Sequence, residues 1–168
     1  MATKKSTKKS APRAAAPARK KAVDAITLLK DDHEKVRTLL GSLEKATGAR
    51  RAKLLAQIEL ELRVHTQIEE EIFYPAWREA ARKKDDQTLF YEALEEHRVV
   101  KDYLPDVSSG NDNEDLKARA KVLKELVEHH ADEEEQEMFP RARKTMDRAE
   151  LRELGERMEA RKQELMRG

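Results

Sequence analysis

The chain has 168 residues, 41% of them charged, with a formal net charge of +1. It has no cysteine, five glycines, five prolines and few aromatic residues, which is typical of an all-α protein and excludes disulfides, thiolate metal sites and cysteine nucleophiles. No apolar run reaches the roughly 18 residues that a membrane span needs, and no secretory signal pattern is present. A cytoplasmic protein is therefore the default expectation.

Residues 1–22 differ in composition from the rest of the chain. They hold eight of the 35 basic side chains and no acid, which leaves 27 basic against 34 acidic side chains in residues 23–168. We expect a disordered basic tail ahead of a single helical domain at 23–168. Two interpretations of the tail stay open: a solubilising segment, or weak, salt-dependent contact with nucleic acid or another anionic surface.

Four histidines, His33, His65, His97 and His130, lie 32 or 33 residues apart. This interval fits one helix of roughly 25 residues plus a short connection, which predicts one histidine on each of four successive helices. Short connections make neighbouring helices antiparallel. The expected fold is all-α: an antiparallel up-down-up-down four-helix bundle in which the four side chains converge.

Apolar residues at three- and four-residue steps define the inward face of each helix, and the histidine occupies one of these steps. The first helix is expected to begin after Asp24, a favourable N-cap. The inward positions are Ile26, Leu29, His33, Val36, Leu40 and Leu43 in the first helix, Ile58, Leu62, His65, Glu69 and Ile72 in the second, Phe90, Leu94, His97, Lys101 and Leu104 in the third, and Leu123, Val127, His130 and Glu134 in the fourth.

Residues 105–114, rich in Gly, Asn, Asp and Ser, predict a loop between the third and fourth helices. Trp77 is expected in the core. A shorter fifth helix is expected after Asp147, packed across the bundle, and no chemistry is evident in it. Its inward residues are Leu151, Leu154, Met158 and Leu165.

An internal repeat relates the two halves of the chain. A shift of 64 residues superposes Asp31-Asp32-His33 on Glu95-Glu96-His97, and a shift of 65 superposes His65, Glu69, Glu70, Pro75 and Arg78 on His130, Glu134, Glu135, Pro140 and Arg143.

The repeat decides between two overlapping His-x-x-x-Glu pairs in the fourth helix. His130 and Glu134 align with the pair in the second helix, whereas His129 and Glu133 point about 100° away. We therefore assign the first pair to the site and His129 to its surroundings. The other acids in the runs 69–71 and 133–135 are expected to be solvated.

A metal site explains the inward polar residues together. A single inward histidine is more simply a hydrogen-bonded core residue, but each unpaired buried polar group costs about 1–3 kcal/mol, and folded chains have only about 5–15 kcal/mol of net stability. Imidazole and carboxylate suit iron, manganese or zinc, and the residues alone do not choose among them. The candidate ligands are His33, His65, Glu69, His97, His130 and Glu134.

The chain resembles the hemerythrin-like, HHE cation-binding family over about residues 24 to 160. Beyond the histidine pattern, Ile72-Phe73-Tyr74-Pro75 and Glu137-Met138-Phe139-Pro140 are similar to that family's signature, and Leu154-Gly155-Glu156-Arg157-Met158 is similar to its C-terminal part. The resemblance implies a left-twisted bundle that holds two iron ions bridged by carboxylates and an oxo or hydroxo group. By position, His33 and His65 would bind one iron, His97 and His130 the other, and Glu69 and Glu134 would bridge them.

Two positions differ from the oxygen-carrying members of this family. Lys101 stands where those proteins have a second histidine on the third helix, and Glu134 follows His130 by four residues where they use an aspartate five residues on. These differences argue against simple reversible oxygen carriage. They imply a more open second iron with Lys101 as a charged or hydrogen-bonding neighbour, or an additional acid such as Glu70 that completes it.

The first functional hypothesis is a non-haem di-iron protein that binds or reacts with dioxygen, peroxide or nitric oxide, extending to peroxide removal. The alternative is an iron- or oxygen-sensing module that acts through a protein partner or, through its basic tail, on nucleic acid. A ferritin-like oxidase is rejected because its Glu-x-x-His motif places the acid first and uses a spacing of three.

Overall fold

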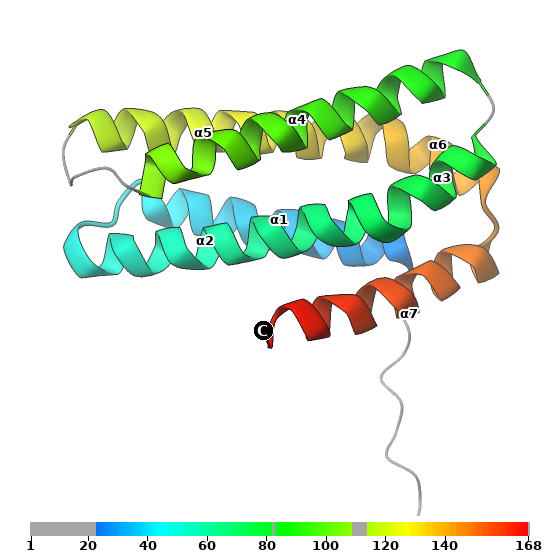
Figure 1. Cartoon of the computed structure of the whole chain (residues 1–168), viewed down its shortest axis with the longest axis horizontal. Helices are drawn as coiled ribbons and strands as arrows, with labels where there is room; N and C mark the ends of the chain where they lie inside the picture. Colours follow the sequence, from blue (N-terminus) through cyan, green and yellow to red (C-terminus); the bar gives the residue numbers. More distant parts are fainter. Residues whose placement is uncertain (1–22, 82, 109–113, 168) are drawn as a thin grey trace, which may run out of the picture.

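The computed structural model describes residues 23–81, 83–108 and 114–167, and over these ranges the chain forms helices and no strand (Figure 1). The π-helices η1 and η2 continue the α-helices on either side of them, so the nine elements make five rods. The elements are α1 (Ala25–Leu43), α2 (Gly48–Ile68), η1 (Glu69–Phe73), α3 (Tyr74–Ala80), α4 (Lys84–Ser108), α5 (Glu114–Glu133), η2 (Glu134–Met138), α6 (Phe139–Thr145) and α7 (Arg148–Leu165).

Four of the rods form the predicted antiparallel bundle. Helix α1 packs against α2 and α5, and α4 packs against α5 and α2, so each rod has two neighbours. Figure 1 shows the chain running along one rod and back along the next, with α7 on the outside against α1 and α2. None of the described helices is both long and apolar enough to cross a bilayer. The predicted disordered tail at residues 1–22 lies outside the described residues.

The helix ends follow the local sequence. Asp24 caps α1, as predicted, by accepting a hydrogen bond from the Thr27 backbone N–H at 3.1 Å. Asp147 and Glu150 form a capping box at the start of α7. Helix α7 crosses the start of α1 at Gly155, where a Cβ atom would lie only 2.2 Å from the Val23 carbonyl oxygen. Only glycine therefore permits this close approach.

Two apolar clusters fill the bundle, and the predicted ligands lie between them along every rod. One cluster contains Phe73, Trp77 and Phe139 near α7, so the prediction that Trp77 is a core residue is confirmed. The other contains Leu40 and Leu123 at the opposite end. The polar layer is thus closed at both ends by apolar packing.

The π-helices change one predicted inward position. In η1 the Tyr74 backbone N–H bonds the Glu69 carbonyl five residues back, and η2 repeats this geometry one repeat later. The wider turn shifts the register, so Phe73 is fully buried while Ile72 is only partly buried. Pro75, which lacks an N–H, stands in the first turn of α3, directly after the π-helix. Ile72, the last position of the predicted stripe, packs against the core but is less buried than its neighbour Phe73.

The predicted loop at residues 105–114 begins too early. Helix α4 continues through Pro105 to Ser108. Pro105 removes the backbone hydrogen bond that an N–H there would donate to the Lys101 carbonyl, and only three more residues of the helix follow it. Val107, fully buried, holds the last turn of α4 against the bundle. Residues 109–113 lie outside the described residues.

Candidate metal centre

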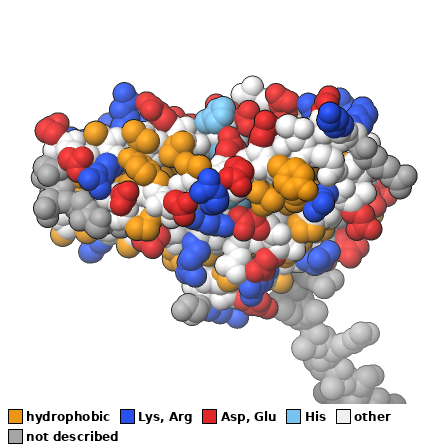
Figure 2. All heavy atoms as spheres, turned by 45° about the horizontal axis from the view of Figure 1, so that its top comes forward, with side chains coloured by type: hydrophobic (Ala, Val, Ile, Leu, Met, Phe, Trp, Pro, Cys, Tyr) orange, Lys and Arg blue, Asp and Glu red, His pale blue; other side chains and the backbone are white. Residues whose placement is uncertain are grey.

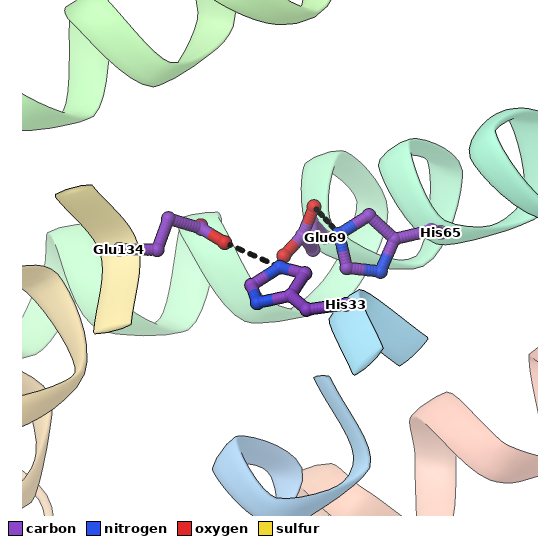
Figure 3. Close-up of side chains that lie close together, drawn as sticks. All are labelled: His33, His65, Glu69 and Glu134. Atoms are coloured by element: carbon purple, nitrogen blue, oxygen red, sulfur yellow. Dashed lines mark ion pairs between the residues drawn. The ribbon is translucent and has the colours of Figure 1, made fainter. Parts of the chain in front are cut away.

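All six predicted ligands lie together at one level of the bundle. His33 comes from α1, His65 from α2 and Glu69 from the start of η1, while α4 supplies His97 and the rod of α5 and η2 supplies His130 and Glu134. Every one is buried, with exposures of 6% or less. Figure 3 shows His33, His65, Glu69 and Glu134 pointing toward one another from different elements. The sequence-based set is therefore brought together in full.

The two glutamates lie between pairs of imidazoles. Glu69 Oε2 is 3.1 Å from His65 Nε2 and 3.3 Å from His97 Nε2. Glu134 Oε2 is 3.2 Å from His33 Nε2 and 3.7 Å from His130 Nε2. Two overlapping donor groups result, one of His33, His65, Glu69 and Glu134, the other of Glu69, His97 and His130. Glu69 belongs to both groups, and Glu134 belongs to the first and approaches His130 of the second.

Several of these donor atoms are buried without a hydrogen-bond partner among the described residues. They are His33 Nε2, His65 Nε2, both carboxylate oxygens of Glu69 and Glu134 Oε2. Buried unsatisfied polar atoms cost about 1–3 kcal/mol each, so this set would be strongly unfavourable in an apolar interior if left unpaired. A cation at this point would satisfy all of them at once.

The spacing of the donor atoms also fits a metal. Two ligands at about 2.1 Å from one ion and at roughly 90–110° to each other lie about 3.0–3.4 Å apart. The nitrogen to oxygen distances of 3.1–3.3 Å across Glu69 agree with this value. Imidazole and carboxylate are the ligands preferred by iron, manganese and zinc, so the residues present fit the expected group.

A second layer of carboxylates holds the outer nitrogen of each imidazole. A histidine that binds metal through one nitrogen usually gives the other to a carboxylate, which fixes the ring and its tautomer. Three of the contacts are within hydrogen-bonding distance and the one at His65 is longer. The Nδ1 to oxygen distances are 3.0 Å for His33 and Glu135, 3.7 Å for His65 and Asp32, 2.8 Å for His97 and Glu70, and 2.8 Å for His130 and Glu96.

Each outer carboxylate in turn contacts a basic side chain. The hydrogen bond from His97, reinforced by Lys101, lowers the pKa of Glu70 to about 2. The hydrogen bond from His33, reinforced by Arg37, lowers the pKa of Glu135 to about 2. The four pairs are Arg37 with Glu135 at 2.8 Å, Lys101 with Glu70 at 2.5 Å, His129 with Glu96 at 3.3 Å, and Lys162 with Asp32.

This layer corrects three expectations. Glu70 and Glu135 were expected to be solvated, but each bonds a histidine of a neighbouring rod. Glu70 binds the outer nitrogen of His97 and lies outside both donor groups, so the structure does not place it as an additional inner ligand. Lys101 is exposed and contacts Glu70 rather than the inner donors. Its neighbour Val100 occupies the buried position instead.

The fifth helix also takes part in the outer layer, contrary to the expectation that it carries no chemistry. Lys162 of α7 bonds Asp32, which faces the outer nitrogen of His65. Burial opposes ionisation of Asp32, but His65 and Lys162 outweigh it and lower the pKa of this carboxyl. The lysine was missed because it lies outside the apolar stripe of α7 and its partner is 130 residues away.

Tyr74 is a functional residue that the sequence reasoning missed. Its hydroxyl donates to Glu134 Oε1 at 2.8 Å and lies 3.3 Å from His97 Nε2. Burial is the main reason that the pKa of Tyr74 lies well above its usual value, so the metal-free site holds the neutral phenol. Phe139 is the residue one repeat later, and it stacks on His33 as Tyr74 stacks on His97. The repeat places Phe139 opposite Tyr74, and this difference between the two halves is the sequence feature that could have identified the hydroxyl.

Two of the inner groups, His65 and His97, are in the protonation state that metal binding needs. Burial opposes protonation of His33, but its hydrogen bonds to Glu134 and Glu135 outweigh burial and raise its pKa. Burial is the main cause that lowers the pKa of His65 to about 4, and burial also lowers the pKa of His97. Burial and the nearby charge of Glu134 raise the pKa of Glu69. Burial opposes ionisation of Glu134 as well, but His130 and His33 outweigh it and lower its pKa. His65 and His97 are therefore neutral ligands at neutral pH.

A small cavity opens beside the four imidazoles. The space open to the centre of a water molecule is about 20 Å³. A buried site needs roughly 10–15 Å³ on this measure to hold one water. The room therefore suits one small molecule. Apart from the histidines and Thr66, its walls are apolar: Val36, Leu62, Val100, Val127 and Ala131.

A comparison with protein families agrees with this site, whereas two other comparisons found nothing similar. A search of curated proteins and a search of solved structures found no match to the chain. The hemerythrin HHE cation binding domain matches residues 24–142, which contain all six inner residues and Tyr74. The match ends within α6, so the sequence resemblance expected as far as residue 160 lies partly beyond it. On this match over most of its length, the chain belongs to the hemerythrin HHE cation-binding domain family.

Proposed function

We propose that the chain is a non-haem di-iron protein that binds or reacts with dioxygen, peroxide or nitric oxide. The observation that carries the proposal is the pair of overlapping donor groups with Glu69 and Glu134 between the histidines. Bound iron would supply the redox chemistry with these small molecules. Because iron, manganese and zinc all accept these ligands, the choice of iron rests on the family.

The chain's own residues would select a small ligand and control protons. The apolar walls of the 20 Å³ cavity leave room for one molecule about the size of water. Tyr74 donates its hydroxyl proton to Glu134 Oε1 at 2.8 Å, which holds a proton directly beside the inner donor groups. The apolar clusters on both sides keep bulk water from the centre.

The proposal is tested on iron-loaded protein mixed separately with dioxygen, hydrogen peroxide and nitric oxide. We expect the visible spectrum to change with at least one of them, and release of dioxygen from peroxide would establish turnover. A His65→Ala, His130→Ala double variant, shown to be folded by circular dichroism, should lose these changes. Spectra that stay the same with all three reagents would contradict the proposal.

A second candidate function, iron sensing through a partner protein, is favoured by one contact. Lys162 connects α7 to His65 through Asp32. Metal binding at His65 would therefore strengthen the attachment of α7 to the bundle. Hydrogen exchange of the α7 amides should then slow when iron is added. Equal exchange with and without iron would remove this candidate.

A further inference from the structure

The second His-x-x-x-Glu pair of α5 forms a separate cluster on the surface. His129 is 66% exposed, and its Nε2 atom lies 3.3 Å from Glu96 Oε1 and 4.0 Å from Glu133 Oε1. One ligand atom from each of these three residues fits within a span of 4.8 Å. Figure 2 shows an exposed histidine with acidic side chains around it. The cluster therefore combines an imidazole with carboxylates from two rods.

The surroundings favour a cation. The charges of Glu92 and Glu137 also act on Glu133. In the described part of the chain, no lysine or arginine forms an ion pair with Glu96 or Glu133, although Glu137 pairs with Arg141. Among the described side chains, the two carboxylates are thus paired with imidazoles alone, Glu133 with His129 and Glu96 with His129 and His130. A divalent ion would supply the missing positive charge.

The cluster is also connected to the buried centre. Glu96 Oε1 faces His129, while Glu96 Oε2 accepts from the outer nitrogen of His130 at 2.8 Å. The same carboxylate therefore belongs to both. Loss of an outer partner of a metal-bound histidine typically changes metal affinity by about 10–100-fold. A cation bound to Glu96 should therefore change the metal affinity of the buried centre.

We propose that His129, Glu133 and Glu96 bind a divalent transition-metal cation as a third, solvent-facing site that shares Glu96 with the buried centre. One imidazole and two carboxylates suit ions such as zinc, with water in the remaining positions. The same His-x-x-x-Glu spacing then occurs twice along the rod of α5 and η2, once facing inward and once facing outward. This site goes beyond the buried di-iron centre and does not depend on it.

Zinc titration of the full-length, iron-loaded chain by calorimetry tests this site. We expect wild type to bind one more zinc ion per chain than His129→Ala. We expect Glu133→Gln to lower the affinity for this additional zinc ion by at least about tenfold. Glu128→Gln, which removes a neighbouring acid that lies 4.0 Å from Lys124, is the matched control and should bind as wild type does. Identical zinc stoichiometry and affinity in wild type and His129→Ala would overturn the proposal.

Iron content measured on the same samples separates this site from the proposed function. Glu133→Gln should keep the iron content of wild type while it loses tight zinc binding, because Glu133 touches none of the four inner histidines. If wild type took up no iron, the di-iron proposal would fail, yet the zinc difference between wild type and His129→Ala would still report the surface site. Loss of iron and zinc together in Glu133→Gln would overturn the idea of a separate site.

Discussion

Each inner histidine uses its two ring nitrogens for different tasks. The Nε2 atoms face the shared carboxylates Glu69 and Glu134, while the Nδ1 atoms face an outer acid. The outer acids are in turn paired with basic groups such as Arg37 and Lys101. The outer acids and their basic partners thus fix the orientation of the imidazole rings, as such contacts do at metal sites.

Glu70→Gln tests the outer layer directly. The substitution removes the acceptor charge that holds His97, so iron affinity, measured by competition with a chelator, should fall by roughly 10–100-fold. The matched control is Glu71→Gln, because Glu71 pairs with Arg161 and contacts no histidine. Equal affinities in the two variants would mean that the outer carboxylate has no effect on the centre.

Tyr74→Phe tests the inner hydroxyl. The change makes this position identical to Phe139 in the other half and leaves Glu134 Oε1 without its donor. We expect a folded protein whose visible spectrum after iron loading differs from that of wild type. Phe139→Tyr, which adds a hydroxyl beside His33 instead, is the reciprocal variant. A Tyr74→Phe spectrum that superimposes on wild type would show that the hydroxyl does not reach the centre.

At the scale of elements, the inward stripes predicted most of the buried side chains. The predicted positions of α1 and α5 are buried, including His33 and His130. Ile72 packs against the core but is only partly buried, because the hydrogen bonds of a π-turn leave no mark in apolar periodicity. The stripe was wrong at Lys101, because the residues alone do not say which of two adjacent positions faces inward. Such π-turns often occur at functional sites.

Gly155→Ala tests how α7 is seated on α1. The added Cβ would collide with the Val23 carbonyl oxygen and the Ala25 nitrogen, so α7 must shift. We expect the free energy of unfolding to fall by about 1–3 kcal/mol. Gly41→Ala is the control, because nothing lies within 4 Å of a Cβ there, and it should stabilise α1 by up to about 1 kcal/mol. Thermal melts of both variants measure the difference, and equal melting temperatures would contradict the contact.

Lys162→Met tests the link between α7 and the centre. The substitution leaves Asp32 buried beside His65 without its cation. Iron affinity should fall by roughly tenfold, as for the loss of other outer partners. Arg161→Met is the comparison, because Arg161 pairs with the exposed Glu71. If both variants bind iron as tightly as wild type, α7 only covers the bundle.

At the scale of the whole molecule, the chain is a duplicated pair of helical hairpins with a fifth helix added. The repeat visible in the sequence predicted both ligand pairs, and the equal spacing predicted the level at which they meet. The outer layer could not be predicted in the same way, because its contacts join rods that are far apart in sequence, as with His33 and Glu135, 102 residues apart. Three residues make the two halves of the site unequal: Tyr74 and His129 lie on the side of His97 and His130, and Lys162 lies on the side of His65.

The central proposal is that the six inner residues hold a pair of iron ions. Metal analysis and the visible spectrum of aerobically reconstituted full-length protein, compared with the folded His65→Ala, His130→Ala variant, measure this directly. We predict about two iron ions per wild-type chain, as in carboxylate-bridged helical bundles, and visible absorption bands that the variant lacks. A wild-type chain that stays folded and colourless without iron, or a variant that retains the full amount, would contradict it.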